Sequence, residues 1–121
     1  MIRDPQRRVQ PAGRGLDVVR VTGRSMLPTL RDRDLLLVRA GARARPGDVA
    51  VVRLPGGRPL SVKRLARRTA GGWWVERDNP AEGVDSWLVG AVPDDDVLAV
   101  AVVRLWPRPR LLMPRRPPVR G

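Results

Sequence analysis

Short apolar runs that end in glycine- or proline-containing turns recur along the chain and restrict its fold most strongly. The runs are rich in valine and leucine and lie at residues 18–22, 35–38, 49–54, 60–65, 73–76 and 97–105. Turn signals separate many of them at intervals of roughly eight to twelve residues, a spacing typical of all-β domains. Almost no stretch shows the 3.6-residue period of an amphipathic helix. The pattern therefore predicts a mainly β fold of the barrel or sandwich type.

The 121 residues suffice for one domain. Residues 1–16 are polar and contain several prolines and glycines, so we expect a flexible lead-in. Residues 17–107 contain all of the apolar runs and form the predicted folded domain. Residues 108–121 are rich in proline and arginine, and we expect them to be a disordered or extended basic tail.

Ser25 lies in the turn after the first apolar run, where it is a candidate nucleophile. A serine hydroxyl needs a base to take its proton, and the chain contains no histidine and no cysteine. Lys63 is the single lysine among the 24 Lys and Arg residues, and arginine cannot be deprotonated in a protein. Apart from the carboxylates and the N-terminal amine, Lys63 is therefore the only candidate base. These residue types lead to the hypothesis of a Ser25–Lys63 catalytic dyad.

Such a dyad requires a neutral lysine, whereas an ordinary lysine with a pKa of about 10.4 is protonated near pH 7. Lowering that pKa by ~3 units takes roughly 4 kcal/mol, which burial among apolar side chains can supply. Lys63 follows Val62 in an apolar-rich run, and Arg64 is expected to point to the opposite face. Ser25 would then attack a peptide carbonyl, and Lys63 would take its proton and pass it to the leaving amine. The backbone N–H of Ser25 is the expected oxyanion donor.

The formal net charge of +12 makes nucleic acid or an acidic surface a partner to consider. The arginines are scattered, however, and only 3% of the residues are aromatic, which argues against a single-strand nucleic-acid groove. No apolar run approaches the roughly 20 residues of a membrane-spanning helix. Residues 1–14 lack the apolar region of a signal peptide, and the absence of cysteine fits a reducing compartment. We therefore expect a soluble, cytoplasmic protein.

Four segments resemble the conserved boxes of the signal-peptidase clan (S24/S26-type) of serine–lysine peptidases. Residues 23–30 (GRSMLPTL) resemble its nucleophile box, and residues 46–51 (PGDVAV) resemble its Gly-Asp box. Residues 62–64 (VKR) resemble the box with the general base, and residues 78–90 (DNPAEGVDSWLVG) resemble the last box. The four segments occur in the order found in that clan, and the resemblance extends over most of the chain.

The resemblance implies a signal-peptidase/LexA-like β-barrel-type single domain with disordered basic tails, without metal or cofactor. It assigns catalysis to Ser25 and Lys63, and it implies supporting or substrate-binding roles for Gly23, Met26, Pro28, Asp78, Asn79, Asp85 and Ser86. Within the clan, the sequence is most similar to the nickel superoxide dismutase maturation proteases. The reasons are the missing membrane anchor, the short interval between the lysine and the last box, and the Gly-Gly-Trp-Trp-Val stretch. The implied partner is a protein substrate, the N-terminal propeptide of a nickel superoxide dismutase precursor.

Three positions depart from the pattern of the clan. Arg77 replaces the usual glycine before Asp-Asn, and Trp87 replaces the usual arginine after Asp-Ser. Gly83 occupies the position of a serine that lies near the lysine in many bacterial signal peptidases. We therefore expect Asp85 to lose its usual neighbouring partner, and Lys63 to be oriented by Ser86 or by backbone carbonyls.

Three other functions remain open at this stage. The first is a type I signal peptidase that docks on anionic lipid through basic tails. The second is a self-cleaving regulator of the repressor type, with Ala12-Gly13 as its cleavage site. The third is a basic nucleic-acid-binding protein without enzymatic activity.

Overall fold

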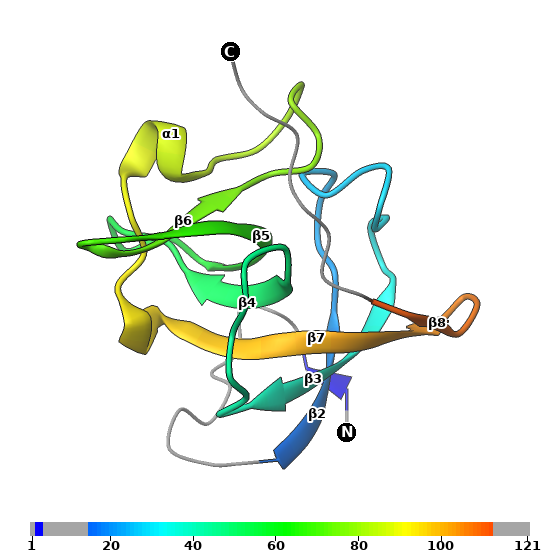
Figure 1. Cartoon of the computed structure of the whole chain (residues 1–121). Coiled ribbons are helices and arrows are strands. Elements are labelled where there is room, and N and C mark those ends of the chain that lie inside the picture. The colour runs from blue at the N-terminus through cyan, green and yellow to red at the C-terminus, as the bar shows by residue number, and fades with distance from the viewer. Residues whose placement is uncertain (1, 4–14, 113–121) are drawn as a thin grey trace.

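The computed structural model describes residues 2–3 and 15–112, which contain one eight-stranded sheet (Figure 1). Its strands are β1 (Ile2–Arg3), β2 (Gly15–Arg20), β3 (Leu35–Ala40), β4 (Val49–Arg53), β5 (Leu60–Thr69), β6 (Gly72–Glu76), β7 (Val97–Trp106) and β8 (Arg110–Leu111). Within the described residues, the helical elements are α1 (Ser86–Val89) and one 3₁₀ turn (Asp94–Asp96). The mainly β prediction is thus confirmed.

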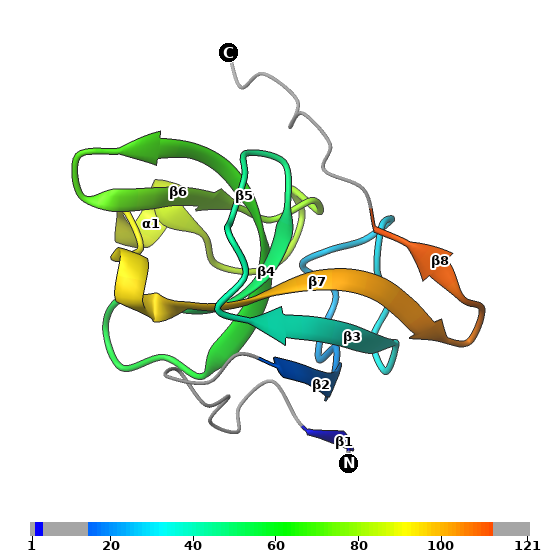
Figure 2. The same ribbon diagram turned by 60° about the horizontal axis from the view of Figure 1, so that its bottom comes forward.

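The strand order is β1-β2-β3-β7-β4-β5-β6, and β8 pairs with β7 outside this path. Only β1 and β2 pair in parallel; the other strand pairs are antiparallel. The long strand β7 pairs with both β3 and β4. Figure 2 shows β7 crossing the molecule, with β2 and β3 on one side and β5 and β6 on the other. Strand β7 thus joins the two halves of the sheet.

Two clusters of buried apolar side chains form the core on the two sides of this arrangement. One contains residues of β2, β3 and β7 together with Met26 and Leu30 from the turn after β2. The other contains residues of β4, β5 and β6 together with Leu54 and Val92. Side chains of β4 contribute to both clusters, because all of residues 49–52 are buried. A strand segment that is enclosed on both faces is apolar throughout, as residues 49–52 are, whereas Arg53 at the end of β4 is exposed.

The six predicted strands are present, and β5 extends furthest beyond its prediction. The apolar run ends at residue 65, but the strand continues through Arg67 and Arg68 to Thr69. The guanidinium groups of these arginines lie 5.0 Å and 5.2 Å from the ring centroids of Trp74 and Trp73. Cation–π contact across the strand pair allows charged residues to occupy a β position that hydropathy alone does not predict.

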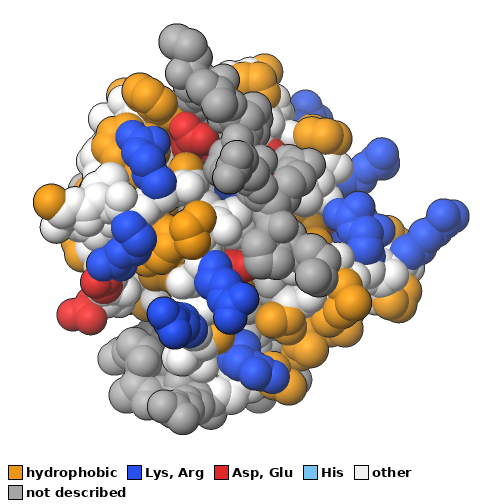
Figure 3. Space-filling model, in the orientation of Figure 1, with side chains coloured by type: hydrophobic (Ala, Val, Ile, Leu, Met, Phe, Trp, Pro, Cys, Tyr) orange, Lys and Arg blue, Asp and Glu red, His pale blue; other side chains and the backbone are white. Residues whose placement is uncertain are grey.

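The two predicted tails are partly described. Ile2–Arg3 pairs with β2, which itself begins at Gly15, and the rest of residues 1–14 lies outside the described residues. Arg110–Leu111 pairs with β7, so this part of the predicted tail is extended strand rather than disordered. Residues 113–121 lie outside the described residues. Lys and Arg side chains are spread over the visible face in Figure 3, with hydrophobic and uncharged groups between them.

Candidate active site

The turn between β2 and β3 contains Ser25 and is anchored in the core immediately after it. Met26 and Leu30 are at most 1% exposed, and Leu30 N donates a hydrogen bond to Met26 O. Burial of two such side chains contributes roughly 3–6 kcal/mol in favour of this conformation. Before the serine, Gly23 has φ = +86°, in the left-handed region that glycine adopts without strain. Gly23 and Met26 thus shape the turn, whereas Pro28 is exposed within it.

Lys63 lies on β5, and its Nζ donates a hydrogen bond of 2.8 Å to Ser25 Oγ. The side chain is almost fully buried, with the residue only 4% exposed. The pKa of Lys63 is lowered from 10.5 to about 8, mainly by burial. Of the two charged groups that also act on this pKa, the Asp85 carboxylate raises it and the Arg77 guanidinium lowers it. With this pKa, roughly a tenth of the lysine is neutral at pH 7 and about half at pH 8. The two candidate residues are therefore in contact, and the amine can act as a base near neutral pH.

A hollow of about 370 Å³ opens beside Ser25 and Lys63. Its walls include Gly23, Arg24, Leu60, Val62 and Gly83. β5 pairs with β4 from residue 60 onwards but with β6 only from residue 64, so one backbone edge of residues 60–63 has no strand partner among the described residues. A larger hollow, of about 930 Å³ beside residues 42–46, contains neither Ser25 nor Lys63. The smaller hollow therefore combines a candidate nucleophile, a candidate base and an open strand edge.

Asn79 holds the peptide groups on both sides of Ser25. Its backbone N–H donates a hydrogen bond of 2.8 Å to Ser25 O, and its Nδ2 donates one of 2.9 Å to Arg24 O. Asn79 Oδ1 accepts a hydrogen bond from Ala81 N, which fixes the amide in this orientation. The last box of the sequence is thus joined directly to the nucleophile turn.

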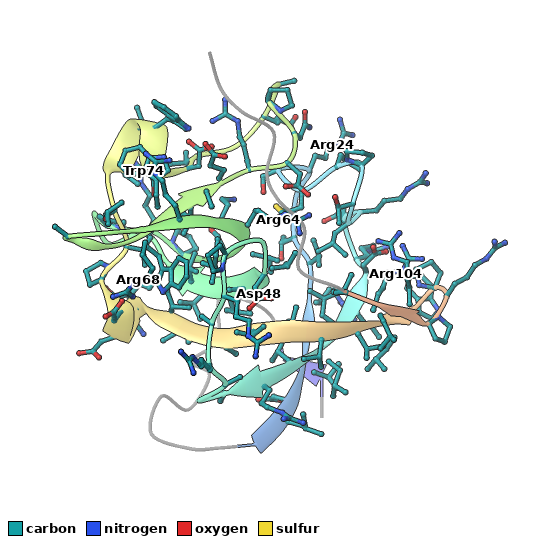
Figure 4. The ribbon with its side chains drawn as sticks, viewed as in Figure 1. Arg24, Asp48, Arg64, Arg68, Trp74 and Arg104 are labelled. Atoms are coloured by element: carbon teal, nitrogen blue, oxygen red, sulfur yellow. The ribbon has the colours of Figure 1, made fainter. Side chains whose placement is uncertain are left out.

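Arg64 forms a buried connection between three segments on the face of β5 opposite Lys63. Its Nη2 lies 2.6 Å from Asp78 Oδ2, and both side chains are at most 4% exposed. Its Nη1 donates to Gly47 O at 2.9 Å, and Thr29 Oγ1 donates to the same Asp78 carboxylate. Figure 4 shows Arg64 in the interior of the molecule. Sequence reasoning placed Arg64 on the opposite face but missed this role; its position directly after Lys63, in an apolar-rich strand, was the available signal.

A family model described as Peptidase S24-like matches residues 6–103 of the chain. The chain belongs to the Peptidase S24-like family. This match confirms the resemblance to the serine–lysine peptidase clan, and membership of a peptidase family implies a protein substrate. No curated protein and no solved structure matches the chain.

In this S24-like domain, Asp85 is fully buried and has a charged partner. Its carboxylate accepts hydrogen bonds from Trp87 N and Arg77 N, both at 3.1 Å. Arg77 Nη1 lies 3.5 Å from Asp85 Oδ1. Asp85 thus lacks the usual arginine at position 87 but has Arg77 as its partner instead. Arg77, which directly precedes the last box, supplies the positive charge. The linear sequence does not show that residues 77 and 85 approach each other in space.

Ser86 does not orient the lysine of the S24-like domain as expected. Its Oγ accepts a hydrogen bond of 2.8 Å from Val75 N, which joins the first residue of α1 to β6. The hydrogen bond of Lys63 Nζ goes to Ser25 Oγ instead. Ser86 and Asp85, the N-cap of α1, therefore fix this helix against β6.

Gly83 packs against the candidate nucleophile of the S24-like domain. A Cβ at this position would lie 2.5 Å from Ser25 Cβ, far closer than two carbon atoms can approach. Its φ of +103° also disfavours any other residue. The glycine is thus required where many bacterial signal peptidases have serine, because the loop before α1 contacts Ser25 directly.

In residues 2–3 and 15–112 there is no group of three or more His, Cys, Asp or Glu side chains that could hold a metal ion. In the same part of the chain, no helix is long and apolar enough to cross a membrane.

Proposed function

We propose that the protein is a serine endopeptidase in which Ser25 is the nucleophile and Lys63 is the general base. The observation that supports this most directly is the 2.8 Å contact between Lys63 Nζ and Ser25 Oγ inside a largely buried site. The lowered pKa of Lys63, about 8, makes its neutral form available for proton transfer. The match to a serine peptidase family supports the same reaction class.

The proposed reaction is acyl transfer in two steps. Ser25 Oγ attacks the carbonyl carbon of the scissile peptide bond while Lys63 Nζ takes the hydroxyl proton. The developing oxyanion accepts a hydrogen bond from the backbone N–H of Ser25. The Lys63 ammonium then gives its proton to the leaving amine, and the ester of Ser25 remains. Lys63 next takes a proton from a water molecule, and the water oxygen attacks the ester carbonyl. The Lys63 ammonium then returns this proton to Ser25 Oγ as the acid product leaves.

The proposed substrate is an extended peptide that lies in the hollow beside Ser25. Residues 60–63 present an unpaired strand edge to this hollow, and a peptide can add to such an edge through backbone hydrogen bonds. We further propose the N-terminal propeptide of a nickel superoxide dismutase precursor as the natural substrate. Support for this finer assignment comes from the sequence resemblance alone, including the Gly-Gly-Trp-Trp-Val stretch.

The test is cleavage of a purified precursor that bears its propeptide, followed by intact-mass measurement. Ser25→Ala and Lys63→Arg should each abolish cleavage, whereas Thr69→Ala, which removes a hydroxyl near the far end of β5, should retain it. Processing that persists in both dyad variants would overturn the proposed mechanism. Cleavage of other extended peptides but not of the dismutase precursor would retain the mechanism and reject the substrate.

A further inference from the structure

Arg77 lies near the Ser25–Lys63 pair, directly after the end of β6. The pairing of β5 with β6 stops at Arg64 and Glu76, the residues next to Lys63 and Arg77. A Cβ placed on Gly83 would lie 3.6 Å from Arg77 Cδ and 2.5 Å from Ser25 Cβ. Ser25 Oγ in turn lies 2.8 Å from Lys63 Nζ. Two cationic side chains thus lie at the candidate site.

Arg77 is held in one orientation by several partners at its backbone and its guanidinium. Its N–H donates to Asp85 Oδ2 at 3.1 Å, and its Nη1 lies 3.5 Å from Asp85 Oδ1. Its Nε donates to Asn79 O and its Nη2 donates to Pro80 O, both at 3.0 Å. Asp85 is fully buried, whereas the Arg77 side chain is 22% exposed. The guanidinium therefore binds the carboxylate with a fixed geometry.

The charged groups around Lys63 come from four segments of the fold. They are Arg24 in the turn after β2, Arg58 before β5, Arg77 after β6, and Glu82 and Asp85 in the loop before α1. From β4, the residue opposite Lys63 is Ala50, which has no charge. Arg24, Arg58 and Glu82 are exposed to solvent, so Asp85 is the buried anion of this group. A buried carboxylate close to an amine favours the ammonium form, which cannot act as a base.

We propose that Arg77 is a positioning residue that binds the Asp85 carboxylate and thereby withholds it from Lys63. Arg77 also places a like charge near the lysine, which further favours the neutral amine. Both effects agree with the direction in which Arg77 shifts the pKa of Lys63. The catalytic consequence rests on the proposed function, but the effect on the protonation of Lys63 does not depend on it.

The composition allows a direct measurement, because Lys63 is the single lysine of the chain. Protein labelled with ¹³C- and ¹⁵N-lysine gives one side-chain signal, and its chemical shift against pH reports the titration of Lys63 alone. Arg77→Met keeps the length of the side chain without its charge, and it should raise the titration midpoint by roughly one pH unit. Arg68→Met is the matched control, since Arg68 lies on β5 like Lys63 but forms an exposed ion pair with Asp94. The titration midpoint of Lys63 in this variant should equal that of the wild type.

A second pair of variants separates the roles of the two charges. Asp85→Asn should lower the titration midpoint of Lys63, because it removes the anion that favours the ammonium. This variant replaces the first test if the Arg77→Met protein does not fold. In the double variant Arg77→Met/Asp85→Asn, the midpoint should fall below that of Arg77→Met. An unchanged midpoint in folded Arg77→Met, or in Asp85→Asn, overturns the proposal. Loss of peptidase activity in the dyad variants is a separate readout, so the two proposals fail independently.

Discussion

The backbone N–H of Asn79 donates a hydrogen bond to the carbonyl of Ser25, and its side chain donates another to the preceding carbonyl. Two adjacent peptide groups of the nucleophile turn are thereby fixed by a residue from the last box. Since the direction of Oγ and of the Ser25 N–H follows from these peptide groups, Asn79 would set the geometry of attack in the proposed mechanism.

Replacement of Asn79 by alanine should lower kcat about tenfold and reduce stability modestly. The variant loses the Nδ2 bond to Arg24 O and the bond from Ala81 N, but it keeps the backbone bond to Ser25 O. Loss of one or two such bonds costs on the order of 1–2 kcal/mol, and 1.4 kcal/mol corresponds to tenfold in rate. Steady-state kinetics with a thermal unfolding curve would check this. Unchanged kcat would contradict the positioning role.

Gly83→Ala should abolish most of the activity, because the added methyl group would displace Ser25. Gly57→Ala is the matched control. Gly57 also has a positive φ, +70°, but a Cβ there meets no atom within 4 Å. Both variants should lose about 1–2 kcal/mol of stability from the backbone conformation, and only Gly83→Ala should lose activity. Equal peptidase activity in the two variants would exclude the predicted collision.

Peptidase activity should rise with pH through a limb near the pKa of Lys63, about 8. In the proposed mechanism the neutral amine is the base, so kcat/KM should increase as Lys63 loses its proton. The chain has no His, Cys or Tyr, so the N-terminal amine is the only other group expected to titrate near this pH. A pH–rate profile of wild-type protein and of a protein with an acetylated N-terminus would identify the group. Absence of a limb near pH 8 in both would contradict a neutral lysine base.

Lys63→Met should stabilise the fold at pH 7 by up to about 3 kcal/mol while it abolishes activity. The folded-state pKa of Lys63 is lowered from 10.5 to about 8, so the unfolded chain binds more protons between these values. The stability of the wild type should therefore rise as the pH increases from about 8 to 10.5, and the advantage of the variant should disappear over that interval. Urea unfolding at pH 7 and at pH 10.5 provides the comparison. If the variant is less stable than the wild type at pH 7, burial of the Lys63 ammonium does not destabilise the fold as predicted.

Arg64→Met should destabilise the protein by roughly 3–5 kcal/mol, because it leaves the Asp78 carboxylate without its buried cation. The double variant Arg64→Met/Asp78→Asn removes both charges and should recover part of this loss. Arg53→Met provides the control, since the pair of Arg53 with Asp96 is exposed and contributes at most about 1 kcal/mol. Denaturant unfolding measures all three. Similar losses for Arg64→Met and Arg53→Met would contradict the importance of burial.

The β character and most strand positions could be predicted from local sequence, because buried strands are short apolar runs and the turns between them contain glycine or proline. The end of β5 did not, since Arg67 and Arg68 are retained in the strand by the rings of Trp74 and Trp73. Helix α1 was not predicted either. It has only four residues, and it depends on Asp85 as its N-cap and on Ser86 as the acceptor from β6.

Residue types alone selected Ser25 and Lys63 as candidates, because the capacity to act as a base is a property of the side chain, and the chain has one lysine and no histidine. Their 2.8 Å contact, the burial that lowers the lysine pKa, and the partner of Asp85 depend on the fold. The pairing of Arg64 with Glu76 brings their chain neighbours, Lys63 and Arg77, into the same region, and the loop before α1 brings Asp85 to Arg77. Electrostatic interaction depends on distance and on exclusion of water, and neither is determined until distant segments pack together.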